Sequence, residues 1–217
     1  MKRREFTQVA AGAVAASGLW VAPAAHAQFK KPEAGTDYQV LDIRAAVDAP
    51  AGKIEVVEFF WYNCPHCNAF EPTLEAWVKK LPKDVAFRRA PVAFRDDFVP
   101  QQRLYYTLEA MGLLDKLHAK VFQAIHAQRL DLSKGEGITA WVAQQGVDKA
   151  KFVEQYNSFT VVTKAQKASK LQNAYKVEGV PALGVAGRYY TDGSIARSME
   201  RALQVVDALV AGIRAGA

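Results

Sequence analysis

One stretch of the sequence constrains the fold more than any other. Residues 54–61 (IEVVEFFW) are β-branched and aromatic apart from two glutamates, a composition typical of a strand buried on both faces. Two residues later comes Cys64-Pro65-His66-Cys67, and apolar residues then recur at helical spacing. Pro65 suits the first turn of a helix, where its missing N–H leaves no hydrogen bond unmade. The stretch predicts a strand leading directly into a helix, with two cysteines at the helix N-terminus.

The rest of the chain falls into three kinds of segment. Residues 85–94 (VAFRRAPVAF) predict a second strand, interrupted or ended by its proline. From about residue 98 to 175 the apolar pattern is helical throughout. Two short apolar runs around Ala186-Gly187 then predict a hairpin, and residues 199–214 predict an amphipathic helix. The predicted order is strand, helix, strand, helical segment, hairpin and helix, which is an α/β protein.

The N-terminus has the pattern of an export signal. Residues 1–27 begin with three basic residues, continue with a short and weakly apolar stretch, and end in Ala25-His26-Ala27, which a signal peptidase accepts. We therefore predict a signal peptide cleaved after Ala27. The apolar stretch of this signal is rich in Ala, Gly and Ser, which disfavours the alternative of an uncleaved membrane anchor. Two adjacent arginines leave both the general secretory route and the twin-arginine route open.

Composition excludes several classes of protein. Two cysteines among 217 residues exclude a disulfide-dense scaffold and a four-thiolate metal or iron–sulfur site. Removing residues 1–27 takes three of 28 basic and one of 22 acidic residues, which leaves a net charge of +4. The charges of both signs are interspersed, whereas a nucleic-acid-binding protein concentrates basic residues on one face, so we expect no nucleic-acid partner. Residues 28–37 (QFKKPEAGTD) are polar and predict a loose lead-in.

The cysteine pair has three interpretations other than redox chemistry. Half of a zinc site is disfavoured because the chain has no other cysteine and because His118 and His126 lie in the helical segment. A passive disulfide between Cys64 and Cys67 would close a very small loop and stabilise little. Incidental reduced cysteines do not suit an exported protein. We therefore predict a redox-active pair, expect no metal site, and assign no role to the two histidines.

Redox chemistry explains each residue of the pair's motif. The thiolate is the attacking species, and a helix N-terminus lowers the pKa of Cys64 through its unpaired N–H groups and dipole. His66 adds positive charge, which makes Cys64 a nucleophile and a good leaving group and makes the disulfide oxidising. Cys67, one turn later, is predicted to be the buried resolving cysteine. Trp61 and Tyr62 either line a substrate surface or, more commonly for aromatic residues at a strand end, pack.

The run EFFWYNCPHC, together with Val180-Pro181, resembles the DsbA family of bacterial periplasmic thiol–disulfide oxidoreductases in the thioredoxin superfamily. The Pro-His pair between the cysteines separates this group from thioredoxins, which carry Gly-Pro. The likeness extends from about residue 38 to the end of the chain. It implies a thioredoxin fold with an inserted helical domain: a first thioredoxin-like part at 28–97, the insertion at 98–175 and a second thioredoxin-like part at 176–217.

The resemblance also implies further site residues. A cis-proline at Pro181 would lie opposite the cysteines, and the Val180 backbone would pair with an extended substrate. The alternative is an ordinary proline at a strand edge. Glu58 would lie under the active site with a raised pKa and shuttle the proton of Cys67, whereas the alternative is a partly exposed glutamate. Strict alternation places Glu55 and Glu58 on opposite faces of the strand, so at least one carboxylate is buried or at the strand end.

We expect a monomeric periplasmic oxidase that passes its disulfide to newly exported proteins. The resemblance implies reoxidation by a quinone-linked membrane partner of the DsbB type, with no cofactor beyond the cysteine pair. The nearest alternative is an isomerase or reductase on the same fold, although dedicated isomerases carry an extra dimerisation domain for which this chain has no room. A peptide-binding chaperone with incidental cysteines is a second alternative. A glutathione-dependent transferase is a third, and it would lack Cys67.

Overall fold

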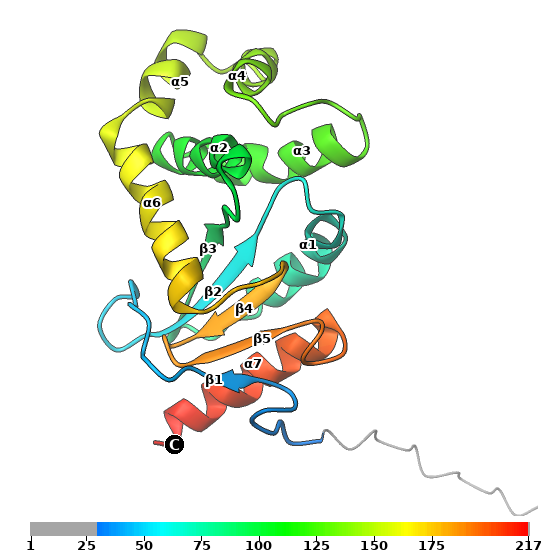
Figure 1. Ribbon diagram of the computed structural model, residues 1–217, viewed down its shortest axis with the longest axis vertical. Helices are drawn as coiled ribbons and strands as arrows, with labels where there is room; N and C mark the ends of the chain where they lie inside the picture. The colour runs from blue at the N-terminus through cyan, green and yellow to red at the C-terminus, as the bar shows by residue number, and fades with distance from the viewer. Residues whose placement is uncertain (1–29, 217) are drawn as a thin grey trace, which may run out of the picture. The chain divides into compact units, whose positions relative to one another are not determined.

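A five-stranded mixed sheet forms the centre of the fold in the computed structural model, which describes residues 30–216 (Figure 1). The signal peptide predicted at residues 1–27 lies outside the described residues. The strand order is β1-β5-β4-β2-β3; only β2 and β3 are parallel, and the other pairs are antiparallel. The strands are β1 (Gln39–Val40), β2 (Ile54–Phe60), β3 (Val85–Pro91), β4 (Ala182–Val185) and β5 (Tyr189–Asp192).

Helices cover both faces of the sheet. Val56 of β2 packs with α1 and α7 in one core, and Val57 and Phe59 pack with helices of the long helical segment in the other. In Figure 1, α1 and α7 lie on one side of the strands and α6 on the other. The helices are α1 (Pro65–Val78), the 3₁₀ turn η1 (Asp96–Phe98), α2 (Val99–Ala110), α3 (Leu114–His126), α4 (Gly135–Gln144), α5 (Lys149–Tyr156), α6 (Phe159–Ala174) and α7 (Met199–Arg214).

The central strand and the two elements that follow it match the sequence pattern closely. Six of the seven residues of β2 are buried, as expected for a strand covered on both faces. The helix α1 begins at Pro65. The second strand ends at Pro91, the proline at which the sequence predicted it to be interrupted or ended, and the Pro91 carbonyl faces away from β2 and accepts a hydrogen bond from Gln102. The last helix covers the predicted residues 199–214.

The hairpin between β4 and β5 turns at the predicted dipeptide. Ala186 and Gly187 both have positive φ, 51° and 69°, the geometry of a tight turn whose twist matches the strands. A side chain at Gly187 would collide with the backbone carbonyl of Ala45, so glycine is required there by packing as well as by backbone conformation.

The lead-in is more ordered than predicted. Ala34 forms a β-bridge with Tyr38, and Asp37 is buried against Arg201 of α7, with 3.1 Å between carboxylate and guanidinium. The side chain of Asp37 also accepts a hydrogen bond from the Glu33 N–H. The prediction of a loose segment is therefore wrong from Glu33 onward, because one buried carboxylate anchors an otherwise polar stretch. The edge strand β1, two residues long, follows it.

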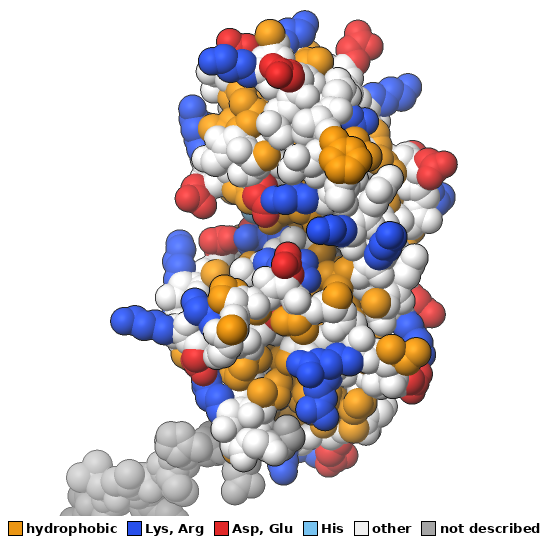
Figure 2. All heavy atoms as spheres, turned by 90° about the vertical axis from the view of Figure 1, so that its left-hand side faces the viewer, with side chains coloured by type: hydrophobic (Ala, Val, Ile, Leu, Met, Phe, Trp, Pro, Cys, Tyr) orange, Lys and Arg blue, Asp and Glu red, His pale blue; other side chains and the backbone are white. Residues whose placement is uncertain are grey.

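The surface carries charges of both signs. On the face shown in Figure 2, Lys and Arg side chains are interspersed with Asp and Glu, and patches of apolar side chains lie between them. No helix within residues 30–216 has the length and apolar character needed to cross a membrane.

Candidate redox site

Cys64 is the N-cap residue of α1, with an extended backbone (φ −76°, ψ 117°). Its Sγ accepts a hydrogen bond from the Cys67 N–H at 3.4 Å, which is the capping contact that serines make with an oxygen. Pro65 occupies the first turn, where no donor is lost. Cys64 is 7% exposed and Cys67 is fully buried, and both are free thiols. One sulfur thus borders the surface, and the other lies one turn deeper.

The two thiols have opposite electrostatic environments. The hydrogen bond from the Cys67 thiol lowers the pKa of Cys64 to about 6, aided by the N–H groups of Cys67 and His66 and by the charge of His66, against partial burial. Burial raises the pKa of Cys67, and the hydrogen bond to Cys64 raises it further. At neutral pH the Cys64 sulfur is therefore largely a thiolate, and the Cys67 sulfur keeps its proton.

Val180 and Pro181 lie against the cysteine pair. The Val180–Pro181 peptide bond is cis, as the resemblance implied. Sγ of Cys64 is 3.4 Å from the carbonyl oxygen of Val180 and donates a hydrogen bond to it when the thiol is protonated. A cavity of about 370 Å³ opens beside them, with His66 and Met199 on its walls. A chain bound in this cavity would lie within reach of Cys64.

Glu58 of β2 is fully buried. Burial raises its pKa to about 8, although the guanidinium of Arg89 opposes the shift. Arg89 Nε lies 2.9 Å from a Glu58 carboxylate oxygen, yet the N–H is not aligned for a hydrogen bond. The charge of Glu58 in turn contributes to the raised pKa of Cys67, so the two groups interact. The alternative of a partly exposed glutamate is wrong.

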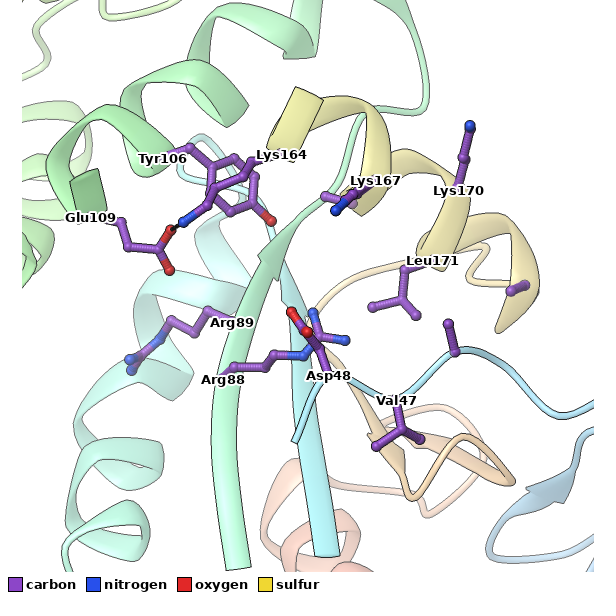
Figure 3. A pocket seen from close by; sticks show the side chains of 13 residues that line it. Val47, Asp48, Arg88, Arg89, Tyr106, Glu109, Lys164, Lys167, Lys170 and Leu171 are labelled. Carbon is purple, nitrogen blue, oxygen red and sulfur yellow. Dashed lines mark hydrogen bonds and ion pairs between the residues drawn. The ribbon is translucent and has the colours of Figure 1, made fainter. Parts of the chain in front are cut away.

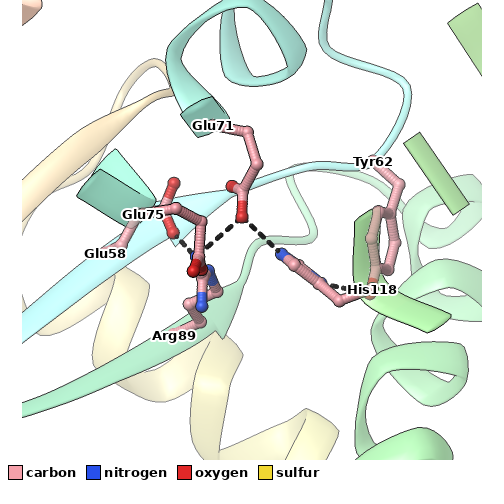
Figure 4. A network of polar contacts seen from close by, with 6 residues as sticks. All are labelled: Glu58, Tyr62, Glu71, Glu75, Arg89 and His118. Atoms are coloured by element: carbon pink, nitrogen blue, oxygen red, sulfur yellow. Dashed lines mark hydrogen bonds and ion pairs between the residues drawn. The ribbon is translucent and has the colours of Figure 1, made fainter. Parts of the chain in front are cut away.

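Arg89 is the centre of a buried cluster of charges that the sequence analysis missed (Figure 4). Its Nη2 binds Glu71 at 2.7 Å and Glu75 at 2.6 Å, both on α1. Burial opposes ionisation of Glu71, but His118 and Arg89 outweigh it and lower the pKa of Glu71. One arginine therefore faces three carboxylates, of which Glu58 is the one that holds its proton near neutral pH. Two adjacent arginines in one predicted strand, beside a strand with two glutamates, were the available signal.

Glu55 lies on the opposite face of β2, as alternation predicts, and it is also buried. Its partner is Arg88, with Arg88 Nε 2.8 Å from one carboxylate oxygen. Two glutamates of β2 thus pair with two consecutive arginines of the parallel neighbour β3, one pair on each face. The Glu55 pair is remote from the cysteines in the sheet and has no part in the redox site.

Two further sequence interpretations are settled by contacts. Trp61 stacks on Phe98 with 3.9 Å between ring centroids, so it packs within the fold. Tyr62 is fully buried, and its hydroxyl and carbonyl oxygen contact His118 and His126. A helical pattern alone does not show which strand end a helix will meet, so the sequence gives these histidines no predicted role.

A second cavity, of about 490 Å³, lies between β3 and α6 (Figure 3). Most of its cations are already paired within the chain: Arg88 binds Glu55, and Lys164 binds Glu109 at 2.6 Å. It contains neither cysteine. Among residues 30–216, no group of three or more His, Cys, Asp or Glu side chains is placed to hold a metal ion.

Comparison with known proteins agrees with this site. Residues 55–204 match the profile of the DsbA-like thioredoxin domain. The chain is 45% identical over 186 residues to the thiol:disulfide interchange protein DsbA of Burkholderia cepacia, covering 86% of this chain and 88% of that protein. It is similar to the crystal structure of Pseudomonas aeruginosa DsbA (TM-score 0.81, 43% identity, 85% and 96% covered). It is also similar to that of Xylella fastidiosa DsbA (TM-score 0.79, 34% identity, 85% and 98% covered).

A thioredoxin fold with a helical insertion and a dithiol at the start of its first long helix defines a thiol–disulfide oxidoreductase. The α/β fold class predicted from the sequence is confirmed. Within that class, the chain belongs to the DsbA-like thioredoxin family.

Proposed function

We propose that this protein oxidises cysteine pairs in newly exported proteins of the periplasm. The observation that carries the proposal is the contrast between the two sulfurs, with Cys64, 7% exposed, capping α1 and Cys67 fully buried one turn deeper. A stabilised Cys64 thiolate favours the reduced form of the protein, so its disulfide is a strong oxidant. The relatives named thiol:disulfide interchange protein support the same chemistry.

The exchange proceeds in two displacements. A substrate thiolate attacks Sγ of Cys64, the Cys64–Cys67 bond breaks, and Cys67 leaves as a thiolate that takes a proton from Glu58. The second substrate thiolate then attacks the substrate sulfur that is bonded to Cys64 in the mixed disulfide. The substrate disulfide forms, and Cys64 leaves as a thiolate. The substrate loses two electrons and gains a disulfide, and the protein gains both electrons as a dithiol.

The surrounding residues have separate roles in these steps. His66 stabilises the departing Cys64 thiolate through its charge, and Pro65 opens the helix that presents the capping N–H groups. The backbone of Val180, before cis Pro181, lies where it can pair with an extended substrate segment. The apolar and polar walls of the adjoining cavity suit many unfolded chains.

The cellular setting follows from the same proposal. Residues 1–27 direct export and are removed after Ala27, and the mature protein works as a monomer in the periplasm. A membrane partner of the DsbB type, linked to quinone, takes the two electrons and restores the disulfide. The cysteine pair is the redox centre, without metal or organic cofactor. Mass measurement of the protein isolated from the periplasm tests the cleavage, with Gln28 expected as the first residue.

Single-turnover oxidation tests the activity. The oxidised mature protein, mixed with a reduced unfolded test protein, is expected to transfer one disulfide per molecule. Cys64→Ser and Cys67→Ser each abolish the transfer, because neither variant can form the Cys64–Cys67 disulfide that accepts the two electrons. A chaperone with incidental cysteines would instead suppress aggregation of the test protein equally well in both variants while transferring no disulfide, and that result would overturn the proposal.

A further inference from the structure

The connection between β2 and α1, residues 61–63, carries Cys64 and has little structure of its own. Its internal backbone hydrogen bond in the described chain runs from the Cys64 N–H to the Trp61 carbonyl, at 3.0 Å. Three residues without a regular ladder have many accessible conformations. The position of Cys64 therefore depends on what the side chains and carbonyls of this connection contact.

Residues on one face of α3 contact both the side-chain hydroxyl and the main-chain carbonyl of Tyr62. His118, Phe122 and His126 follow each other at four-residue spacing, so they share a face of the helix. His118 Nδ1 is 2.8 Å from the Tyr62 hydroxyl, and His126 Nε2 is 2.8 Å from the Tyr62 carbonyl oxygen. The Phe122 ring packs between them against the tyrosine ring, with 5.1 Å between centroids. A single helical face thus holds both the backbone and the side chain of Tyr62.

The protons of these contacts can be assigned. Burial raises the pKa of Tyr62, so its hydroxyl keeps its proton and donates to His118 Nδ1. Burial lowers the pKa of His118, so the ring is neutral and its proton is on Nε2, which faces Glu71 at 3.3 Å. Nε2 of His126 donates to the Tyr62 carbonyl, which can only accept.

A second helix of the same segment holds the next residue. Gln101 of α2 is 1% exposed, and its Nε2 donates to Oδ1 of Asn63 at 2.7 Å and to the Leu132 carbonyl at 3.1 Å. Asn63 directly precedes Cys64. The helices of residues 99–126 therefore bind both residues before the cysteine through hydrogen bonds that tolerate little displacement.

We propose that Gln101, His118 and His126 are positioning residues of the redox site, through which the helical insertion holds Cys64 in its capping geometry. The inference rests on the proposed function, since it concerns the reactivity of the same cysteine. The Cys67 N–H reaches Sγ of Cys64 only at 3.4 Å, so displacement of the connection by about 0.5 Å weakens the contact. Without these hydrogen bonds the thiolate loses part of its stabilisation, and the disulfide becomes less oxidising.

A purely structural role for these side chains predicts something different. They would then change the free energy of unfolding but leave the reactivity of Cys64 in the folded molecules unchanged. The test therefore reads two properties of the folded reduced protein: the pH at which Cys64 ionises, followed by thiolate absorbance, and the equilibrium constant for oxidation of glutathione by the protein disulfide.

The matched pair of variants is Gln101→Met and Gln172→Met in the full mature protein. Gln172 is also a buried glutamine of the insertion, and its Oε1 accepts a hydrogen bond from the Ala93 N–H at 2.8 Å, away from the connection. We expect Gln101→Met to reduce the glutathione equilibrium constant about three- to tenfold and to raise the ionisation pH of Cys64 in proportion. His126→Phe, which keeps the ring packing, is expected to act in the same direction. Gln172→Met leaves both properties unchanged.

If Gln101→Met folds poorly, Asn63→Ala breaks the same hydrogen bond from the other side and is expected to lower the equilibrium constant in the same direction; if both fold, they form a double-mutant cycle. Asn63→Ala removes the acceptor of the same hydrogen bond, so Asn63→Ala and Gln101→Met are expected to shift the equilibrium constant non-additively. Additive effects, or equal shifts in Gln101→Met and Gln172→Met, overturn the positioning role. A weakly oxidising wild-type protein would instead overturn the proposed function, and the differences between variants would still report on the positioning role.

Discussion

Ionisation of Cys64 makes the stability of the reduced protein depend on pH in a way that can be calculated. The pKa of an ordinary cysteine is about 8.5, and that of Cys64 is lowered to about 6. Because the folded-state pKa is depressed, the stabilisation is full above the unfolded pKa and is lost as pH falls through 6. At pH 7 it amounts to at most about 1.4 kcal/mol, the value for a pKa shift of this size without solvent screening.

The comparison of reduced wild type with reduced Cys64→Ala isolates this contribution. Urea unfolding at pH 5 and pH 7 is expected to show the difference in unfolding free energy shifting by about 1 kcal/mol in favour of the wild type at the higher pH. In a Cys67→Ala background the shift is smaller, because Cys67 no longer donates its thiol proton to Cys64. A difference that is the same at both pH values would refute the lowered pKa and, with it, the electrostatic account of the site.

Three further variants test separate parts of the structure. Arg89→Met leaves buried carboxylates without their cation and is expected to lower the free energy of unfolding at pH 7 by about 3–5 kcal/mol. The loss is expected to be smaller at pH 5, where Glu71 takes up a proton in the variant, and a loss that grows toward acid contradicts this. Glu58→Gln should remove an inflection near pH 8 from the stopped-flow rate at which glutathione reduces the protein, and an unchanged profile excludes Glu58 as its source. Gly187→Ala forces a side chain against the Ala45 carbonyl at positive φ, which should destabilise the fold by about 1–3 kcal/mol in thermal or urea unfolding; a neutral effect contradicts the packing argument.

Local sequence patterns were sufficient where one short segment determines its own structure. The β-branched run of β2, the proline after Cys64 and the Ala186-Gly187 turn each specify a conformation through local backbone preferences. The chemistry of the cysteine pair could also be predicted locally, because a helix N-terminus lowers the pKa of the cysteine that caps it.

Partners brought together from distant segments were not predictable in the same way. Arg89 meets Glu58 because the parallel register of β2 and β3 places them side by side, and no pattern within either strand gives that register. His118 lies on an ordinary amphipathic helix, and its contact with Tyr62 depends on how that helix docks. The order of the lead-in likewise depends on one long-range ion pair, from Asp37 to Arg201.

The central claim is the direction of electron flow, and the equilibrium reduction potential of Cys64–Cys67 tests it most directly. The mature protein is equilibrated with glutathione buffers of known potential, and the free thiols are counted after alkylation. We expect a potential well above the value of about −180 mV that characterises protein disulfide isomerase. A potential near that of thioredoxin, about −270 mV, would contradict it and make the protein an exported reductant on the same fold.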